Sequence, residues 1–164
     1  MNIFVLDTNP KLCAQMHCDK HVVKMILEHA QMMCTTHHLH PSGYGRAYNI
    51  PYKVTHKNHP CTLWLRESIT NYQWLYSMTY WLNEEYKIRF NHDVNHKSWD
   101  VIQSLPICPS IPYIGRTEFA QAMPDDYKDK NAVKAYRKYY NMDKIKLHKW
   151  TNSNTPEWIR SVLE

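Results

Sequence analysis

The sequence predicts an all-α protein in which residues 1–164 form a single compact domain, with two long packed helices and three shorter ones. Three observations support this fold class. Only three glycines occur in 164 residues, and β-turns and bulges depend on residues that tolerate positive φ. Hydrophobic residues make up 43% of the chain, with six Trp and twelve Tyr, which suffices for one packed core. Apolar residues recur with helical spacing along two long segments.

The first long helix is expected to begin near Pro10 and to continue to about His37. Capping side chains in Asp7-Thr8-Asn9 precede a proline that suits the first turn of a helix. Residues 41–60, which hold two of the three glycines and three prolines without an apolar period, are predicted to form an ordered loop. The apolar arc of this helix contains Leu12, Met16, Val23, Ile26, Leu27, Ala30 and Met33.

The second long helix is expected to begin at Pro60 and to end near Phe90. Its middle is aromatic nearly all round, which predicts a central position. A third helix is predicted over Ser98–Leu105, because spaced prolines follow it. One face of the second helix contains Trp64, Ser68, Asn71, Leu75, Met78, Leu82 and Tyr86.

The last part of the chain is predicted to add short helices. Residues 117–123 have the composition of one or two helical turns. Asp129 is expected to cap a fourth helix within residues 129–150, and Thr155-Pro156 to begin a terminal one.

Composition also narrows the function class. The net charge is +5 with eleven His counted as neutral, which suits a phosphate-bearing partner, although a basic surface also simply maintains solubility. Five cysteines without a CxxC pair indicate reduced thiols. No basic leader and no apolar run of about 18 residues is present in the sequence. We therefore expect a cytoplasmic protein without a membrane partner and without a cofactor.

An unusual polar stripe lies on the first predicted helix. At 100° per residue, His17, His21, Lys24 and Glu28 fall within roughly 60° of arc, with Lys20 beside them. One interpretation is the solvated face of an amphipathic helix. The other is a binding face, because crowded imidazoles and ammonium groups favour an anion.

Asp19 is predicted to need a partner, since it projects near the middle of the apolar arc. A buried carboxylate without a cation is strongly destabilising. Arg66 is the predicted partner in a structural ion pair, with His56 or His59 as alternatives. A rotated or kinked helix that exposes Asp19 to water is the remaining possibility.

Zinc binding by His17 and His21 is the metal hypothesis that the i, i+4 spacing raises, with a third ligand from residues 55–59. The Glu of the metalloprotease motif is missing, and Lys20 and Lys24 would repel a dication. We therefore expect no metal.

Residues 55–60 precede the second long helix, whose positive N-terminal end suits a phosphate, although the same residues also suit a capping loop. If this loop meets the first helix, the cleft suits metal-independent phosphodiester cleavage or non-catalytic binding of a nucleotide signal or of DNA. The acid–base candidates are His17, His21, His56 and His59. The phosphate-binding candidates are Lys20, Lys24, Lys57, Arg66 and Asn71.

The fourth predicted helix interleaves cations with aromatic residues, as nucleic-acid surfaces do. A charged outer face over an aromatic core explains the same pattern. The candidate nucleic-acid surface consists of Lys134, Arg137, Lys138, Lys144 and Lys146.

A family resemblance extends over about the first 90 residues. The strings "LCAQMHCDKHVVKM", "YKVTHKNHPCTLWLRESITNYQWL" and "EEYKIRF" resemble the small all-helical pyrimidine-dimer DNA glycosylase (endonuclease V) family of phages and bacteria. The strings CDKHVVKM and THKNHPC are also similar to those of uncharacterised small proteins of tailed phages, which implies the cytoplasm of an infected bacterial host. The resemblance implies an all-helical fold, a nucleic-acid ligand and, as a third candidate function, base excision from DNA.

The glycosylase family attacks the sugar with the amine of a Thr exposed by removal of the initiator Met, and a helix Glu supports the ring-opened intermediate. His17 matches the helix His of that family. The chain departs from the pattern at Asn2, whose bulk should keep Met1 in place, and at Lys24, which stands nearest to the position of the Glu. Lys20 or Lys24 is an alternative source of the imine, since desolvated lysines form imines in other enzymes.

Overall fold

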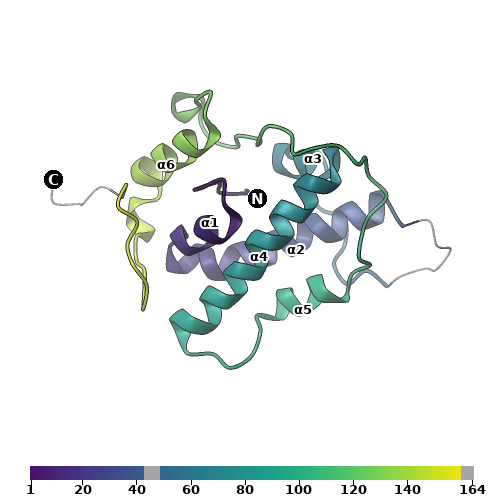
Figure 1. The fold of residues 1–164 in the computed structure, drawn as a ribbon, viewed down its shortest axis with the longest axis horizontal. Helices are drawn as coiled ribbons and strands as arrows, with labels where there is room; N and C mark the ends of the chain where they lie inside the picture. Colours follow the sequence, from purple (N-terminus) through teal and green to yellow (C-terminus); the bar gives the residue numbers. More distant parts are fainter. Residues whose placement is uncertain (43–48, 160–164) are drawn as a thin grey trace.

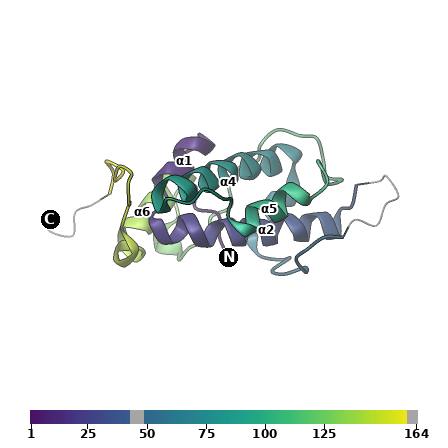
Figure 2. The ribbon, with the colours of Figure 1, turned by 90° about the horizontal axis from the view of Figure 1, so that it is seen from below.

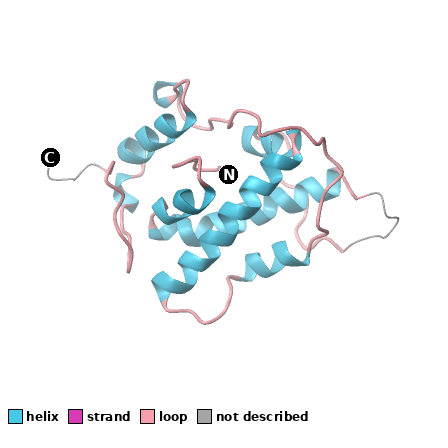
Figure 3. Cartoon of the chain, in the orientation of Figure 1, coloured by secondary structure: helices cyan, strands magenta, loops and turns pink. Residues whose placement is uncertain are grey.

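The computed structural model of the chain describes residues 1–42 and 49–159, and this part is all-helical (Figures 1 and 3). None of the described helices combines the length and the apolar character that crossing a membrane requires. The α-helices are α1 (Pro10–Met16), α2 (Asp19–Leu39), α3 (Pro60–Glu67), α4 (Ile69–Phe90), α5 (Lys97–Ser104) and α6 (Ala132–Asp143), joined by the 3₁₀ helices η1 (Asp125–Tyr127) and η2 (Ile145–Leu147).

The two long helices α2 and α4 pack against each other and form the centre of the fold (Figures 1 and 2). Helix α1 lies on α4, and α5 contacts α2 on another side. Wholly buried Met25 and Ile26 of α2 and Leu75 and Met78 of α4 belong to the core. The predicted fold class, with two long helices and shorter ones around them, is confirmed.

The first long helix is interrupted, contrary to the prediction. The backbone of His17 and Cys18 is extended between α1 and α2. Two backbone carbonyls here accept from Arg89 of α4, at 2.6 Å for His17 and 2.9 Å for Gln15. The N–H of Cys18 donates to the hydroxyl of Tyr140 at 3.2 Å. Because these distant groups bond to the backbone of residues 15–18, the helix breaks without leaving these backbone groups unpaired.

The second long helix is also interrupted, at Ser68, which separates α3 from α4. Ser68 is extended, and its hydroxyl oxygen accepts from the N–H of Thr70 at 3.1 Å as the cap of α4. The N–H of Ile69 donates to the carbonyl of Pro112 at 2.9 Å. The loop after α5 therefore supplies the partners that compensate for the break.

The shorter elements follow the prediction in part. Helix α5 begins and ends within one residue of the predicted limits. Residues 117–123 form no helical turn, and the cap of α6 is Asn131, whose side chain accepts from Lys134 N–H, rather than Asp129. Residues 156–159 form a turn where the terminal helix was predicted to begin. Residues 43–48 of the predicted loop and residues 160–164 lie outside the described residues.

Asp19 pairs with Arg89 and not with Arg66, so the predicted ion pair is wrong. The Arg89 guanidinium is buried, 3.3 Å from Asp19 and 3.0 Å from Glu85. Both carboxylate oxygens of Asp19 also accept from Thr151. The break before α2 explains the difference, because it places Asp19 in the first turn of α2, facing the C-terminal end of α4.

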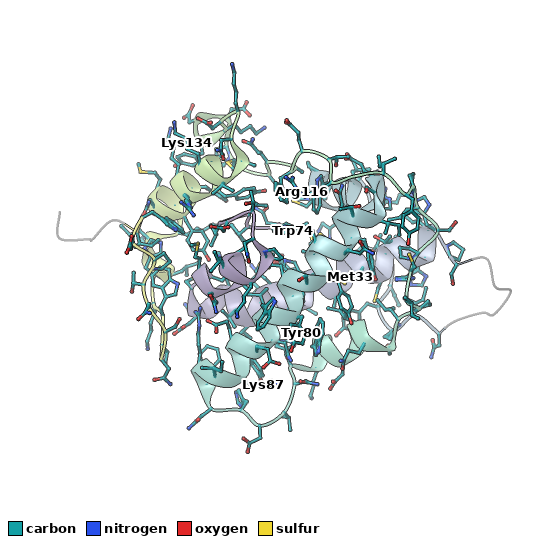
Figure 4. All side chains as sticks on the ribbon, in the orientation of Figure 1. Met33, Trp74, Tyr80, Lys87, Arg116 and Lys134 are labelled. Atoms are coloured by element: carbon teal, nitrogen blue, oxygen red, sulfur yellow. The ribbon has the colours of Figure 1, made fainter. Side chains whose placement is uncertain are left out.

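We expect Arg89→Met to destabilise the fold by about 3–5 kcal/mol, because it leaves two buried carboxylates and two carbonyls without their donor. The free energy of unfolding in urea measures the loss. The control is Lys87→Met, which removes a pair with Glu84 whose side chains are 28% and 30% exposed and which should cost less than about 1 kcal/mol. Similar losses in the two variants would contradict this role of Arg89. Figure 4 shows Lys87 at the periphery.

Candidate functional site

The first six residues lie along α2, between this helix and α6 (Figure 1). The α-amino group of Met1 is 2.8 Å from a carboxylate oxygen of Glu28. Phe4 stacks on the ring of His21, with 4.4 Å between ring centroids. The carbonyl of Phe4 accepts from the thiol of Cys13 at 3.2 Å. The segment therefore runs antiparallel to α2, from Glu28 back towards α1.

This segment explains the polar stripe, which begins at His17 and continues along α2. His17, His21 and Glu28 are buried, whereas Lys20 and Lys24 are exposed. Neither of the two interpretations of the stripe describes it fully, because three of its five residues are buried where the N-terminal segment lies. The imidazoles and Glu28 face protein, and only the ammonium groups face solvent.

The two buried histidines are held neutral by their surroundings. Burial lowers the pKa of His17 to about 4, with the Arg89 charge acting in the same direction. The pKa of His21 is lowered to about 3, mainly by burial and to a smaller extent by the charges of His17 and Lys144. His17 Nδ1 donates to the carbonyl of Cys13 at 2.8 Å. A general acid or base works best with a pKa near the operating pH, so these environments do not favour the acid–base role expected for His17 and His21.

His59 lies in the electrostatic field of the Met1 amine. It caps α3, and its Nδ1 accepts from the N–H of Cys61 at 3.1 Å. Burial lowers the pKa of His59, the N-terminal ammonium and His56 lower it further, and Glu28 opposes them. Capping by Nδ1 leaves Nε2 as the protonated nitrogen of neutral His59.

His56 is exposed, and its positive φ of 47° places it in the left-handed region. Its Nδ1 is 2.7 Å from the hydroxyl of Thr55. His59 thus lies in the electrostatic field of Glu28 on α2. His17, at the end of α1, and His21, in the first turn of α2, contact Phe4 instead.

Three predicted phosphate contacts differ in their availability. Lys57 is exposed, but Arg66 turns back and donates to the Lys57 carbonyl at 2.8 Å. Asn71 is buried, donates to Trp64 O and Thr117 Oγ1, and accepts from the Thr117 N–H. The prediction that Asn71 contacts a phosphate is wrong, because the loop after α5 occupies its amide.

The cations of the C-terminal region do not form one free surface. Arg137 donates to the carbonyl of Leu6 at 2.9 Å and lies 3.4 Å from Asp7, so it anchors the N-terminal segment. Lys144 lies 4.9 Å from the ring centroid of Tyr139. The remaining predicted residues, of which Lys134 is drawn at the outer side of α6 in Figure 4, are the exposed Lys134, Lys138 and Lys146.

The sequence did not identify the partner of the N-terminal amine. Glu28 follows Lys24 by one helical turn on the same face of α2, and this spacing was the available signal. Asn2 is buried, and its side chain donates to the carbonyl of Ala122 at 2.9 Å. Among residues 1–42 and 49–159, no cluster of three His, Cys, Asp or Glu side chains is placed to hold a metal ion.

Comparison with known proteins identifies the family of this chain. A family model described as pyrimidine dimer DNA glycosylase matches residues 1–98, which is more than half of the chain. The chain therefore belongs to the pyrimidine dimer DNA glycosylase family, as the resemblance indicated. No curated protein and no solved structure gives a significant match. The matched region contains Met1, Glu28 and His59 but ends before α6.

We expect stability to fall as the pH is lowered from about 6.5 towards 4, because the unfolded chain then binds protons that folded His17 and His21 exclude. Each such histidine contributes a slope of up to about 1.4 kcal/mol per pH unit within this window. Urea unfolding across this window measures the slope of the free energy of unfolding against pH. For His17→Asn this slope should be smaller than for the wild type by the contribution of about one proton, up to about 1.4 kcal/mol per pH unit. An unchanged slope would show that His17 is protonated alike in the folded and unfolded chains.

Proposed function

We propose that the protein is a DNA glycosylase that removes a damaged pyrimidine by forming an imine through the α-amino group of Met1. The contact between this amine and Glu28 carries the proposal, because the family combines an N-terminal amine with a helix Glu. The Met1 side chain is only 2% exposed, whereas the residue as a whole is half-buried. Most of the exposed surface of Met1 therefore belongs to its main chain, which carries the amine.

Glu28 suits the proton transfers of this reaction. As a carboxylate it takes a proton from the Met1 ammonium group, which leaves a neutral amine. The amine nitrogen bonds to C1′ of the sugar while the bond from C1′ to the base breaks, and the departing base receives one amine proton. The ring oxygen then leaves C1′ with the proton held by Glu28. The product is an iminium ion and a sugar hydroxyl, and water releases the sugar from the enzyme.

The alternative imine sources are less suitable. Lys20 and Lys24 are exposed on α2, and a nucleophilic lysine depends on desolvation or on a neighbouring cation that lowers its pKa. Metal-independent phosphodiester cleavage by paired histidines is also less suitable, because His17 and His21 are buried and held neutral. Base excision uses the amine and the carboxylate that are in contact.

DNA is the partner that this function requires. The chain carries a formal charge of +5. The exposed residues His56 and Lys57 belong to the same loop as His59, whose pKa the charge of the Met1 amine lowers. We assign these two side chains to the phosphates that flank the damaged base. Exposed lysines on α6 are suited to the duplex further away.

The first test is chemical trapping with sodium borohydride, using duplex DNA with one pyrimidine dimer or one abasic site. A covalent adduct should form, and mass spectrometry should place it on the N-terminal amine of the peptide that contains Met1. Glu28→Gln should slow trapping about 100-fold or more, since positioned proton transfer contributes about 10²–10⁴-fold. The control is Glu84→Gln, which changes a half-buried carboxylate of α4 that pairs with Lys87.

Three outcomes would contradict this chemistry. An adduct that is lost in Lys24→Met and kept in Glu28→Gln would assign the imine to Lys24. Binding of damaged DNA without any adduct or base release would indicate a non-catalytic DNA-binding protein. Strand cleavage that borohydride does not trap would revive the phosphodiester mechanism.

A second test concerns the phosphate contact of Lys57. Lys57→Ala should weaken binding of all duplexes alike and reduce the slope of log affinity against log salt by about 1. Fluorescence anisotropy at several salt concentrations measures this slope. The matched control is Lys97→Ala, at the exposed first residue of α5. Equal slopes for wild type and Lys57→Ala would remove Lys57 from the interface.

A further inference from the structure

The side chain next to the Met1 amine is fixed by groups from three other segments. The Oδ1 atom of Asn2 accepts from the Tyr136 hydroxyl at 3.0 Å and from the Cys61 thiol at 3.5 Å. Its Nδ2 donates to the carbonyl of Ala122 at 2.9 Å. Asn2, Cys61 and Tyr136 are all buried. The residue adjacent to Met1 therefore has little freedom to move.

Tyr136 of α6 joins these segments through one hydroxyl. Its single proton is shared between Asn2 Oδ1 and the carbonyl of Ala120 at 2.9 Å. Its oxygen accepts from the N–H of Ala122 at 3.1 Å. The hydroxyl thus holds both Asn2 and the segment that contains the second partner of Asn2. Burial raises the pKa of Tyr136 well above its ordinary value, so the hydroxyl keeps its proton.

Helix α6 holds the other end of the N-terminal segment as well. Arg137, the next residue of α6, donates to the carbonyl of Leu6 and pairs with Asp7. Residues 2 and 6 of the segment are therefore both tied to consecutive residues of one helix. Since α6 lies outside residues 1–98, one side of each of these contacts is supplied by a part of the chain that the family model does not cover.

We propose that Tyr136 is a positioning residue for the Met1 amine, which it holds against Glu28 through the side chain of Asn2. This inference rests on the proposed function for its catalytic consequence but not for the placement of the amine. A nucleophile that is held in place avoids the entropic cost of finding the reacting carbon. A displacement of about 1 Å reduces rates by as much as about 10²-fold.

The decisive experiment measures the amine directly, without DNA. The full-length protein is treated briefly with an acylating reagent, and the labelled fraction of the N-terminal amine is read by peptide mass spectrometry. Tyr136→Phe, which keeps the ring and removes the hydroxyl, should raise the labelling rate of this amine about fivefold or more, because the released amine opens more often to solvent. Lysine side chains in the same digest provide the internal reference.

A matched control removes a buried tyrosine hydroxyl elsewhere. The Tyr72 hydroxyl is 2.8 Å from His37 Nε2, towards the C-terminal end of α2, and both residues are buried. In Tyr72→Phe, the reagent should label the N-terminal amine at the wild-type rate. Urea unfolding of both variants shows that each is folded under the labelling conditions, so a difference between them reports the local loss of the Tyr136 contact.

A second variant tests the connection through Asn2. Asn2→Leu keeps the bulk of the side chain and removes its hydrogen bonds, so it should reproduce the faster labelling. Because Tyr136 acts through Asn2, the double variant should label no faster than the faster of the two single variants. Independent contributions that add in the double variant would overturn the proposed connection. The intact mass of each variant verifies that Met1 is present.

The steady-state rate of base release, together with the yield of borohydride adduct, then measures the catalytic consequence. Tyr136→Phe should lower kcat about tenfold or more with little change in KM for damaged DNA, because positioning acts on the reacting amine and not on the duplex. Wild-type labelling rates in Tyr136→Phe would overturn the inference. Faster labelling in Tyr136→Phe, with no adduct in any form of the protein, would support the positioning and reject the glycosylase.

Discussion

The burial of residues 2–6 between α2 and α6 is the constraint on which the arrangement of this protein depends. Phe4 lies on His21, Asn2 reaches Tyr136, and the Met1 amine contacts Glu28. An N-terminus is ordinarily the most mobile part of a domain unless it is tied down. Here it is held at several points, so its amine occupies a fixed position beside a carboxylate.

A second constraint is the buried guanidinium of Arg89, which connects the end of α4 to the break between α1 and α2. It donates to two carboxylates and two backbone carbonyls. A buried charge is tolerated when it is paired and its hydrogen bonds are satisfied. Through these contacts Arg89 fixes the start of α2, and with it the surface along which the N-terminal segment lies.

These two constraints separate the residues of the polar stripe by function. His17 and His21 are covered and neutral, so they serve packing and hydrogen bonding. Glu28 is placed at the amine, where a carboxylate supports proton transfer. Lys20 and Lys24 remain in solvent. The stripe thus contributes buried packing groups, a candidate catalytic group and a basic surface, because different elements cover successive positions along it.

The sequence by itself determined the helical class, the starts at Pro10 and Pro60 and the limits of α5, since caps, prolines and apolar periodicity act within a few residues. It also indicated the family and the polar side of α2 that contains Glu28. Only the tertiary structure decided the helix breaks at His17 and Ser68. The carbonyl of His17 accepts from Arg89, which is 72 positions away in the sequence. At the break at Ser68, the N–H of the next residue, Ile69, donates to the carbonyl of Pro112 in the loop after α5. The pairing of Glu28 with the Met1 amine was decided in the same way, because no local pattern specifies which distant backbone atom a helix face will meet.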